Sequence, residues 1–270
     1  MIVRSLKLCQ KHVRAQNGKD PVILARLILE TNEIALVCLC ILQLMQYSLA
    51  AAHDFRAKQL DVYSLDTPPK GTKLPSALAP WTSVPEIISA LSPQYDATLS
   101  VLRDFQATVS VEHDTTARRT RQQTGDMERE DIRQALEETL ASLAEMLCKL
   151  CVERVNWCRA LAEDEQDKSG ADDIWKQYLA KRGDWIKPLG INLVDIANLA
   201  TFGRPDKALD IAEIYRDYKS LVELCLEPRE DDINRHQRVH ERLEYYLMHY
   251  GEDFAFTLYN FYLQNRTLSN

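Results

Sequence analysis

The chain has 270 residues, of which 46% are hydrophobic, so it can bury a substantial core in one or two domains. Its formal net charge of −7 provides no general basic field, and direct binding to nucleic acid or to an anionic membrane is not expected. Seven cysteines, an odd number in a chain too long to need covalent staples, indicate a reducing intracellular compartment.

Residues 1–112 are predicted to form an N-terminal helical part. Ile2–Gln16 shows helical spacing through Leu6, Cys9 and Val13. Between Pro21 and about residue 65 almost nothing interrupts the chain, which predicts one long helix or two nearly continuous ones. The apolar run within it, residues 34–45, holds 12 residues, too few to span a bilayer. We therefore expect a core helix covered on all sides and no transmembrane segment.

Prolines interrupt the helical part at residues 66–85, where five of them predict an extended loop. A short helix, Glu86–Leu91, and a longer one, Tyr95–Val111, are expected to follow. Residues 113–127 are polar and contain glycine, and we expect a mobile linker there. This linker would separate the N-terminal part from residues 128–270, unless the whole chain forms one continuous helical domain.

The second part is predicted to open with the longest helix of the chain, from Met127 to about Glu165. Its apolar residues recur at heptad spacing, which indicates a long helix packed along another one. The row consists of Leu136, Leu143, Leu150 and Trp157. Packing against residues 34–45 is favoured over a dimer, because that run needs an equally long apolar partner. A turn at Ser169–Asp173 and two helices, Ile174–Arg182 and Trp185–Phe202, are expected next.

Three short amphipathic helices are predicted in the last third of the chain. Pro205 suits the first position of a helix, where its missing N–H costs nothing. Asp217 can cap the helix that follows, and Gly251 can end the third as a C-cap glycine. Short helices joined by tight turns bury their apolar stripes by stacking on sequence neighbours, as in an α-solenoid.

The helix after Gly251 is apolar on two sides. One stripe consists of Phe254, Leu258, Phe261 and Tyr262. The opposite stripe consists of Phe256, Tyr259 and Leu263. The preceding helices can cover only one of them, so the other requires a further helix of the same chain or another protein. Both interpretations stay open at this point.

Two clusters could suggest chemistry, and both are better explained structurally. Cys148 and Cys151, with Cys158 beyond them, lie within a helix and lack the second ligand pair that structural zinc needs. His236 and His240 stand one turn apart, but the zinc-protease motif needs glutamate directly after the first histidine, where this chain has glutamine. No phosphate-binding or hydrolase motif occurs, so we expect no cofactor, no metal and no enzyme.

No stretch favours a strand over a helix, and no fixed short repeat is visible. The predicted fold class is all-α, an irregular α-solenoid or stacked helical bundle with long central helices and a C-terminal stack of short ones. Such a scaffold is typical of a protein-interaction module.

Three segments together resemble the C-terminal helical region of the nucleoporin 133 family, a scaffold subunit of the nuclear pore Y-complex. They are Lys207–Cys225, with an Ala-Glu-x-Tyr helix and a Leu-Val-x-x-Cys helix, Arg242–Gly251, and the aromatic helix Phe254–Leu263. The resemblance extends over about residues 185–265. It implies an irregular α-solenoid at the nuclear pore, without catalysis, which supports nucleocytoplasmic transport of mRNA and protein.

The resemblance also implies end-to-end docking onto the neighbouring Y-complex subunit, nucleoporin 107 in animals and 84 in yeast. We carry this contact to one face of the aromatic helix, Phe256, Tyr259 and Leu263, with Leu258 and Tyr262 as the other candidate face. The family also has an N-terminal β-propeller and further helices after the aromatic one, so the chain is expected to be part of a longer protein. The alternative function is a generic helical adaptor or a solenoid like those of vesicle coats. A helical enzyme with a metal at His236 and His240 is the third interpretation.

Overall fold

The computed structural model describes residues 21–63, 85–113, 122–161, 165–190, 204–226 and 235–268. These residues form helices and no strand, which confirms the all-α class. The helices are α2 (Pro21–Tyr63), α3 (Pro85–His113), α4 (Gln122–Leu161), α5 (Glu165–Gly190), α6 (Pro205–Ile214), α7 (Tyr218–Leu226), α8 (Arg235–Tyr250) and α9 (Glu252–Leu268).

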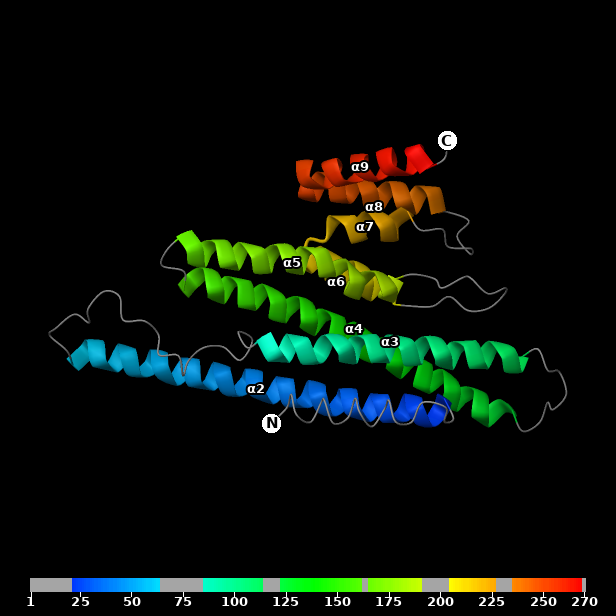
Figure 1. The fold of residues 1–270 in the computed structure, drawn as a ribbon, viewed down its shortest axis with the longest axis horizontal. Helices are drawn as coiled ribbons and strands as arrows, with labels where there is room; N and C mark the ends of the chain where they lie inside the picture. The colour runs from blue at the N-terminus through cyan, green and yellow to red at the C-terminus, as the bar shows by residue number, and fades with distance from the viewer. Residues whose placement is uncertain are drawn as a thin grey trace.

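The helices stack in the order of the chain. Figure 1 shows α2 at one end of the molecule and α9 at the other, with α4 and α5 between them. Each helix packs mainly on its sequence neighbours: α2, α3 and α4 contact one another, α5 joins α4 to α6 and α7, and α9 lies on α7 and α8. The repeat-free stack of long and then short helices is the irregular solenoid that the sequence predicts.

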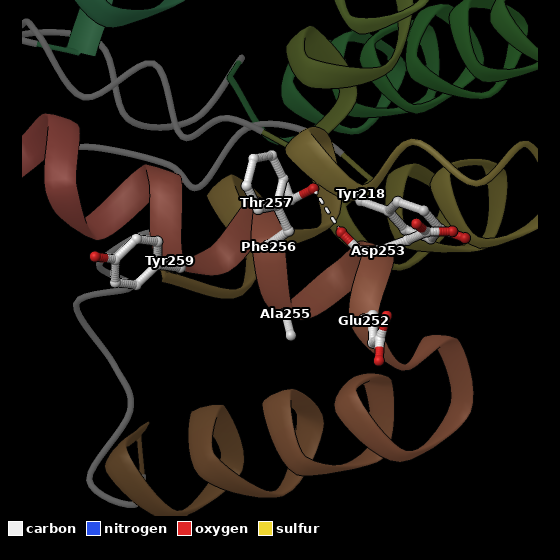
Figure 2. A pocket seen from close by; sticks show the side chains of 7 residues that line it. All are labelled: Tyr218, Glu252, Asp253, Ala255, Phe256, Thr257 and Tyr259. Atoms are coloured by element: carbon white, nitrogen blue, oxygen red, sulfur yellow. Dashed lines mark hydrogen bonds between the residues drawn. The ribbon is translucent and has the colours of Figure 1, made fainter.

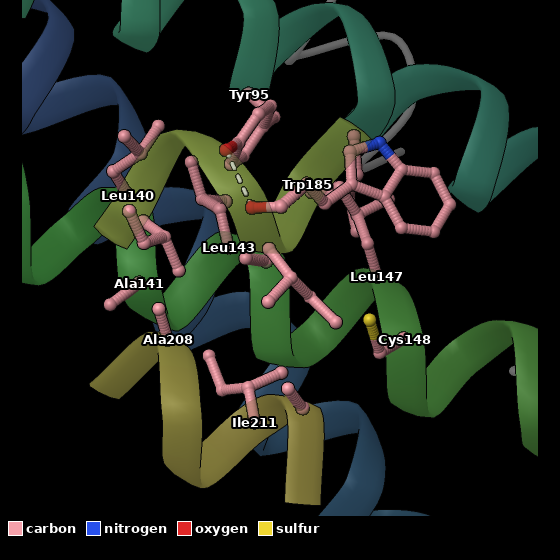
Figure 3. Close-up of a cluster of buried hydrophobic side chains, with 14 of the residues drawn as sticks. Tyr95, Leu140, Ala141, Leu143, Leu147, Cys148, Trp185, Ala208 and Ile211 are labelled. Carbon is pink, nitrogen blue, oxygen red and sulfur yellow. Dashed lines mark hydrogen bonds between the residues drawn. The ribbon is translucent and has the colours of Figure 1, made fainter. Parts of the chain in front are cut away.

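The apolar row of α4 forms the centre of the core. Leu136, Leu143 and Leu150 are all fully buried, as the heptad spacing predicts. Figure 3 shows Leu140, Leu143 and Leu147 of α4 between Tyr95 and Trp185 on one side and Ala208 and Ile211 of α6 on the other. Across the row, the Tyr95 hydroxyl of α3 donates a hydrogen bond of 2.7 Å to the carbonyl of Trp185 in α5. The long helices are thus locked together through α4.

The expectation that residues 34–45 are covered on all sides is wrong. The inner face of α2 packs on α3 and α4 through Ala25, Ile28 and Leu39, which are fully buried. The outer face is bare among the described residues, with Ile34 60% and Ile41 52% exposed. A helix at the end of a stack has neighbours on one side only, and periodicity does not reveal which helix is terminal.

By length and composition, Pro21–Met45 is the one stretch of the described residues that could cross a membrane. Core helices of water-soluble proteins meet the same criteria, and α2 contributes one whole face to the helical core. The 12-residue run from Ile34 underestimates the length of the apolar stretch, which begins at Pro21 and has 25 residues. The absence of a transmembrane segment stays a prediction.

Three breaks that were expected between helices are absent. The structure has one helix, α3, where two were expected around Leu91–Tyr95, although Pro93 lies inside it. Leu91 and Tyr95 are both fully buried, and their packing outweighs the hydrogen bond that proline cannot make. Similarly, α5 continues through Ser169–Asp173, where Ala171 is buried, and through the break expected between Arg182 and Trp185. The helix that begins near Met127 was expected to be the longest, but α4 has 40 residues and α2 has 43.

Several predictions lie outside the described residues. They are the helix Ile2–Gln16, the loop at 66–84, the linker at 114–121 and the stretch 191–202. α4 begins at Gln122, so the last residues assigned to the linker are helical.

One polar cluster is buried between α2 and α3. The Asn32 amide nitrogen donates to the Thr98 hydroxyl at 2.9 Å, and the Gln94 amide nitrogen donates to the Asn32 amide oxygen at 2.7 Å. The Thr98 hydroxyl in turn donates to the Gln94 carbonyl at 2.8 Å. All three side chains are buried, so these bonds fix the register of α2 against α3.

Asn32→Leu keeps the side-chain volume similar but leaves the Gln94 amide buried without its acceptor. We expect a loss of roughly 1–3 kcal/mol in the free energy of unfolding, measured by chemical denaturation. Glu33→Gln, on the exposed neighbour, should change it by less than about 0.5 kcal/mol. Adding Gln94→Leu and Thr98→Val to Asn32→Leu should restore part of the loss, and unchanged stability of the single variant would contradict the role of the cluster.

Candidate partner-binding surface

The short helices begin and end where the sequence places them. Pro205 is the first residue of α6, and Gly251 follows α8 with φ of 62° while its N–H donates to the Leu247 carbonyl at 3.0 Å. Asp217 caps α7, because its carboxylate accepts the Ser220 backbone N–H at 3.5 Å and also the Ser220 hydroxyl at 2.6 Å. These ends fix the short turns between the helices and therefore their stacking.

The turn between α6 and α7 has a residue that sequence reasoning did not single out. Arg216 has φ of 51°, a conformation that usually selects glycine. Its N–H donates to the Glu213 carbonyl at 3.2 Å, and the Asp217 N–H donates to the Ala212 carbonyl at 2.8 Å, which is the Schellman pattern. These two hydrogen bonds hold Arg216 in the left-handed conformation, so the turn forms without a glycine that would mark it in the sequence.

The C-terminal stack is tied to the long helices by two ion pairs from α5. Arg182 Nε lies 3.4 Å from Asp217 Oδ1, and both side chains are largely buried. The Arg182 guanidinium also donates to the Tyr215 carbonyl at 3.2 Å. Lys187 Nζ lies 2.6 Å from Glu223 Oε2 of α7. The short helices are thus held against the rigid bundle.

An aromatic cluster packs against the inner face of α9. The Phe254 ring is fully buried, with its centroid 5.4 Å from that of Tyr246 and 6.3 Å from that of Tyr218. Tyr218 in turn packs on Tyr250 at 5.2 Å. Aromatic pairs at such separations stabilise beyond their buried area. The cluster joins α7, α8 and α9 into one unit.

A hydrogen bond ties the same cluster to α6. The Tyr246 hydroxyl donates to Glu213 Oε1 at 2.5 Å. Burial, together with this bond to a carboxylate, raises the pKa of Tyr246 far above its ordinary value. The phenol therefore keeps the proton that it donates to Glu213 at pH values well above the ordinary pKa of tyrosine.

The two stripes of α9 have different environments, as their spacing predicts. Phe254 is buried, and Leu258 and Phe261 are half-buried on the inner face. The opposite stripe is exposed: Phe256 by 68%, Tyr259 by 61% and Leu263 by 44%. Tyr262, assigned to the inner stripe, is exposed as well. Neither α7 nor α8 covers this outer face.

A shallow pocket opens between α7 and α9. It is lined by Tyr218, Glu252, Asp253, Ala255, Phe256, Thr257 and Tyr259 (Figure 2). The Thr257 hydroxyl donates to the Asp253 carbonyl at 2.9 Å within the helix, as Figure 2 shows. The pocket brings aromatic rings and two carboxylates together but no nucleophile paired with a base. Its chemistry is that of a contact surface rather than of an active site.

Sequence reasoning missed the exposed row of α8. Tyr245 and Met248 are exposed next to His249, whose ring stacks on that of Tyr245 with centroids 5.5 Å apart. Met248 lies off the apolar stripe of α8, and an apolar residue off its stripe was the available signal. With the outer face of α9, this row gives the end of the molecule two exposed apolar helix faces.

The structure also places the cysteines and histidines. Cys148 and Cys151 are buried within α4, and burial raises the pKa of Cys151 to about 11 and raises that of Cys148 as well. His240 is exposed on α8, and the side chain of His236 lies outside the described residues. The described part of the chain contains no cluster of three histidine, cysteine, aspartate or glutamate residues able to hold a metal.

A non-repeating helical stack with a bare aromatic face at its end is the architecture of a scaffold protein that joins other proteins. The family model described as "Non-repetitive/WGA-negative nucleoporin C-terminal" matches residues 10–269. The chain therefore belongs to this nucleoporin family, a component of the nuclear pore complex at the nuclear envelope. The match confirms the family expected from the sequence.

Among known proteins, "Nucleoporin nup132" of Schizosaccharomyces pombe is 28% identical over 246 residues. The alignment covers 91% of this chain but 18% of that relative, so the chain spans less than a fifth of its length. No solved structure matches the chain. The family supports a structural role at the nuclear pore.

Two phenylalanines of α9 provide a matched test of its two faces. Phe254→Ala removes a fully buried ring from the aromatic cluster and should cost about 3–5 kcal/mol of local stability. Phe256→Ala removes an exposed ring and should cost less than about 0.5 kcal/mol. Hydrogen exchange of the α8 and α9 amides measures both. Equal effects of the two changes would show that the faces are assigned incorrectly.

Proposed function

We propose that this chain is a non-enzymatic scaffold segment of the nuclear pore Y-complex. It docks end to end, through the outer face of α9, onto a neighbouring helical nucleoporin of the nucleoporin 107 or 84 type. By holding that contact it supports the assembly through which mRNA and protein are transported. The family membership supports the place in the pore, and the exposed face of α9 supports the contact.

The observation that carries this proposal is the row Phe256, Tyr259 and Leu263. Fully burying a large apolar side chain is worth roughly 1.5–3 kcal/mol, so the row offers several kcal/mol to a partner that covers it. The inner face of the same helix is fixed by the buried ring of Phe254 and by the α7 and α8 contacts. A partner therefore meets a surface that is already ordered and does not spend binding energy on ordering it.

The second candidate function is a generic helical adaptor or a coat-like solenoid. The exposed α8 row, with Tyr245 and Met248, supports this second function, because it offers a separate apolar surface to a different partner. The two functions share one architecture and differ in what is bound. Binding to the Y-complex neighbour therefore separates them, whereas the fold does not.

The double variant Tyr259→Asp, Leu263→Asp tests the proposed contact. Both positions are exposed, so the charges should leave the fold intact, but they would be desolvated in a complex. We expect binding to a nucleoporin 107-type subunit to fall by at least about a hundredfold, measured by calorimetry or by pull-down with purified proteins.

The matched control is Leu44→Asp, Met45→Asp. These positions are also exposed, but they lie on α2 at the opposite end of the stack (Figure 1). The control should bind as tightly as the unmodified chain. Wild-type affinity of the α9 variant would eliminate this docking face, and an unmodified chain that does not bind would favour the adaptor function.

A further inference from the structure

The pocket between α7 and α9 combines apolar surface with negative charge. Its walls carry three aromatic rings, from Tyr218, Phe256 and Tyr259 (Figure 2). They also carry two carboxylates, from Glu252 and Asp253, and no basic residue. A side chain that enters this pocket therefore meets rings and acidic groups at the same place.

Glu252 belongs to the same helix face as the row proposed to dock. Glu252, Phe256, Tyr259 and Leu263 follow one another at i, i+4, i+7 and i+11, so they form one stripe along α9. Glu252 is exposed, and Asp253 is exposed at the edge of this stripe. The outer face of α9 is thus acidic in its first turn and apolar in the turns that follow.

The two carboxylates have no counter-charge among the described residues, where neither forms an ion pair or a side-chain hydrogen bond. By contrast, Lys187 pairs with Glu223 at 2.6 Å across the same stack. Negative charge in the first turn of a helix is favourable in itself. That preference accounts for acidic residues at the start of α9 but not for their place beside three aromatic rings.

Both walls of the pocket are held in place by the chain itself. The Tyr218 ring packs on those of Tyr250 and Phe254, with centroids 5.2 Å and 6.3 Å away. The first turn of α9 is closed by the Ala255 N–H, which donates to the Gly251 carbonyl at 3.1 Å. A partner therefore spends little binding energy on ordering this site.

An arginine side chain matches both parts of the pocket. Its guanidinium is planar, stacks on aromatic rings and binds carboxylates through paired N–H donors. A lysine ammonium supplies the charge without the planar stacking. A purely apolar side chain would remove the carboxylates from water without giving them a partner, which is costly.

We propose that the neighbouring subunit docks on α9 through a helix that places an arginine in this pocket, against Glu252, Asp253 and the ring of Phe256. The inference rests on the docking function proposed for α9 and names the chemistry of its partner. The arginine lies about one helical turn from the apolar side chains that cover the rest of the stripe. Because the charge is at one end of the stripe, this pair fixes the position of the partner helix along α9.

Neutral substitutions test the charge while keeping the shape. Glu252→Gln with Asp253→Asn should weaken binding of a purified nucleoporin 107-type subunit by about tenfold or more, because the arginine is then desolvated without its carboxylates. Surface plasmon resonance should show this loss chiefly as faster dissociation. Calorimetry at several salt concentrations should show an affinity that depends less on salt than that of the unmodified chain.

The matched control is Glu30→Gln with Glu33→Gln. It makes the same change in net charge at two exposed carboxylates of α2, at the opposite end of the stack. Its dissociation rate should stay within about twofold of that of the unmodified chain. Equal losses in the two variants, or a loss confined to the association rate, would overturn the proposal, because charge that only steers the encounter does not occupy a pocket.

A ring variant tests whether one group contacts both walls. Phe256→Leu keeps the position apolar but removes the ring, and it should weaken binding by about threefold or more. Combined with the neutral substitutions at Glu252 and Asp253, the loss should be at least about twofold smaller than the product of the separate losses. Strictly multiplicative losses would overturn the proposal. The buried ring of Phe254 is unchanged in every variant, and hydrogen exchange of the α9 amides checks that the helix is intact.

The outcomes separate this inference from the docking function. If Tyr259→Asp with Leu263→Asp abolishes binding while the neutral variant binds as tightly as the unmodified chain, the docking face stands and the arginine is overturned. An unmodified chain that does not bind overturns both. Self-association of the purified chain that the neutral substitutions weaken, measured by analytical ultracentrifugation, would assign the pocket to a second copy and overturn the proposal as well.

Discussion

Burial of the leucine rows of α4 is the interaction on which the rest of the fold depends. Leu136, Leu143 and Leu150 are fully buried, and α4 contacts α2, α3, α5 and α6. A helix with a broad apolar face is stable only when several other helices cover that face. The position of α5 follows from this requirement, and α5 in turn holds the short helices through Arg182 and Lys187.

A stack in which each helix packs on its neighbours must have two ends. Helices α4 and α5 have neighbours on both sides in the stack, whereas α2 and α9 have described neighbours on one side only. Both end helices are apolar on both sides, so each has a stripe without a cover among the described residues. A repeat-like scaffold needs polar capping faces to remain monomeric, and neither end provides one.

The sequence predicted which residues form the core and where the short C-terminal helices begin and end. It did not predict where the long, buried helices are continuous. Pro205, Asp217 and Gly251 act through their own backbone chemistry, and the structure confirms all three. The breaks expected between Leu91 and Tyr95 and at Ser169–Asp173 are absent, because the buried residues Tyr95 and Ala171 gain more from a continuous helix than Pro93 and Gly170 cost it. The two stripes of α9 were predictable, but the bare face of α2 depends on stacking order, which periodicity does not encode.

The two bare faces differ in composition, and the difference bears on what covers them. The α9 face carries Phe256 and Tyr259, and the exposed α8 row next to it adds Tyr245 and Met248. Tyrosine, phenylalanine and methionine are enriched in interfaces between separate proteins, where tyrosine tolerates water before binding.

The α2 face is aliphatic, with Ile23, Ile34, Val37 and Ile41, which resembles the interior of a domain. An aliphatic seam is suited to permanent cover by the same chain or by a stable neighbour. The aromatic face is suited to a partner that arrives during assembly.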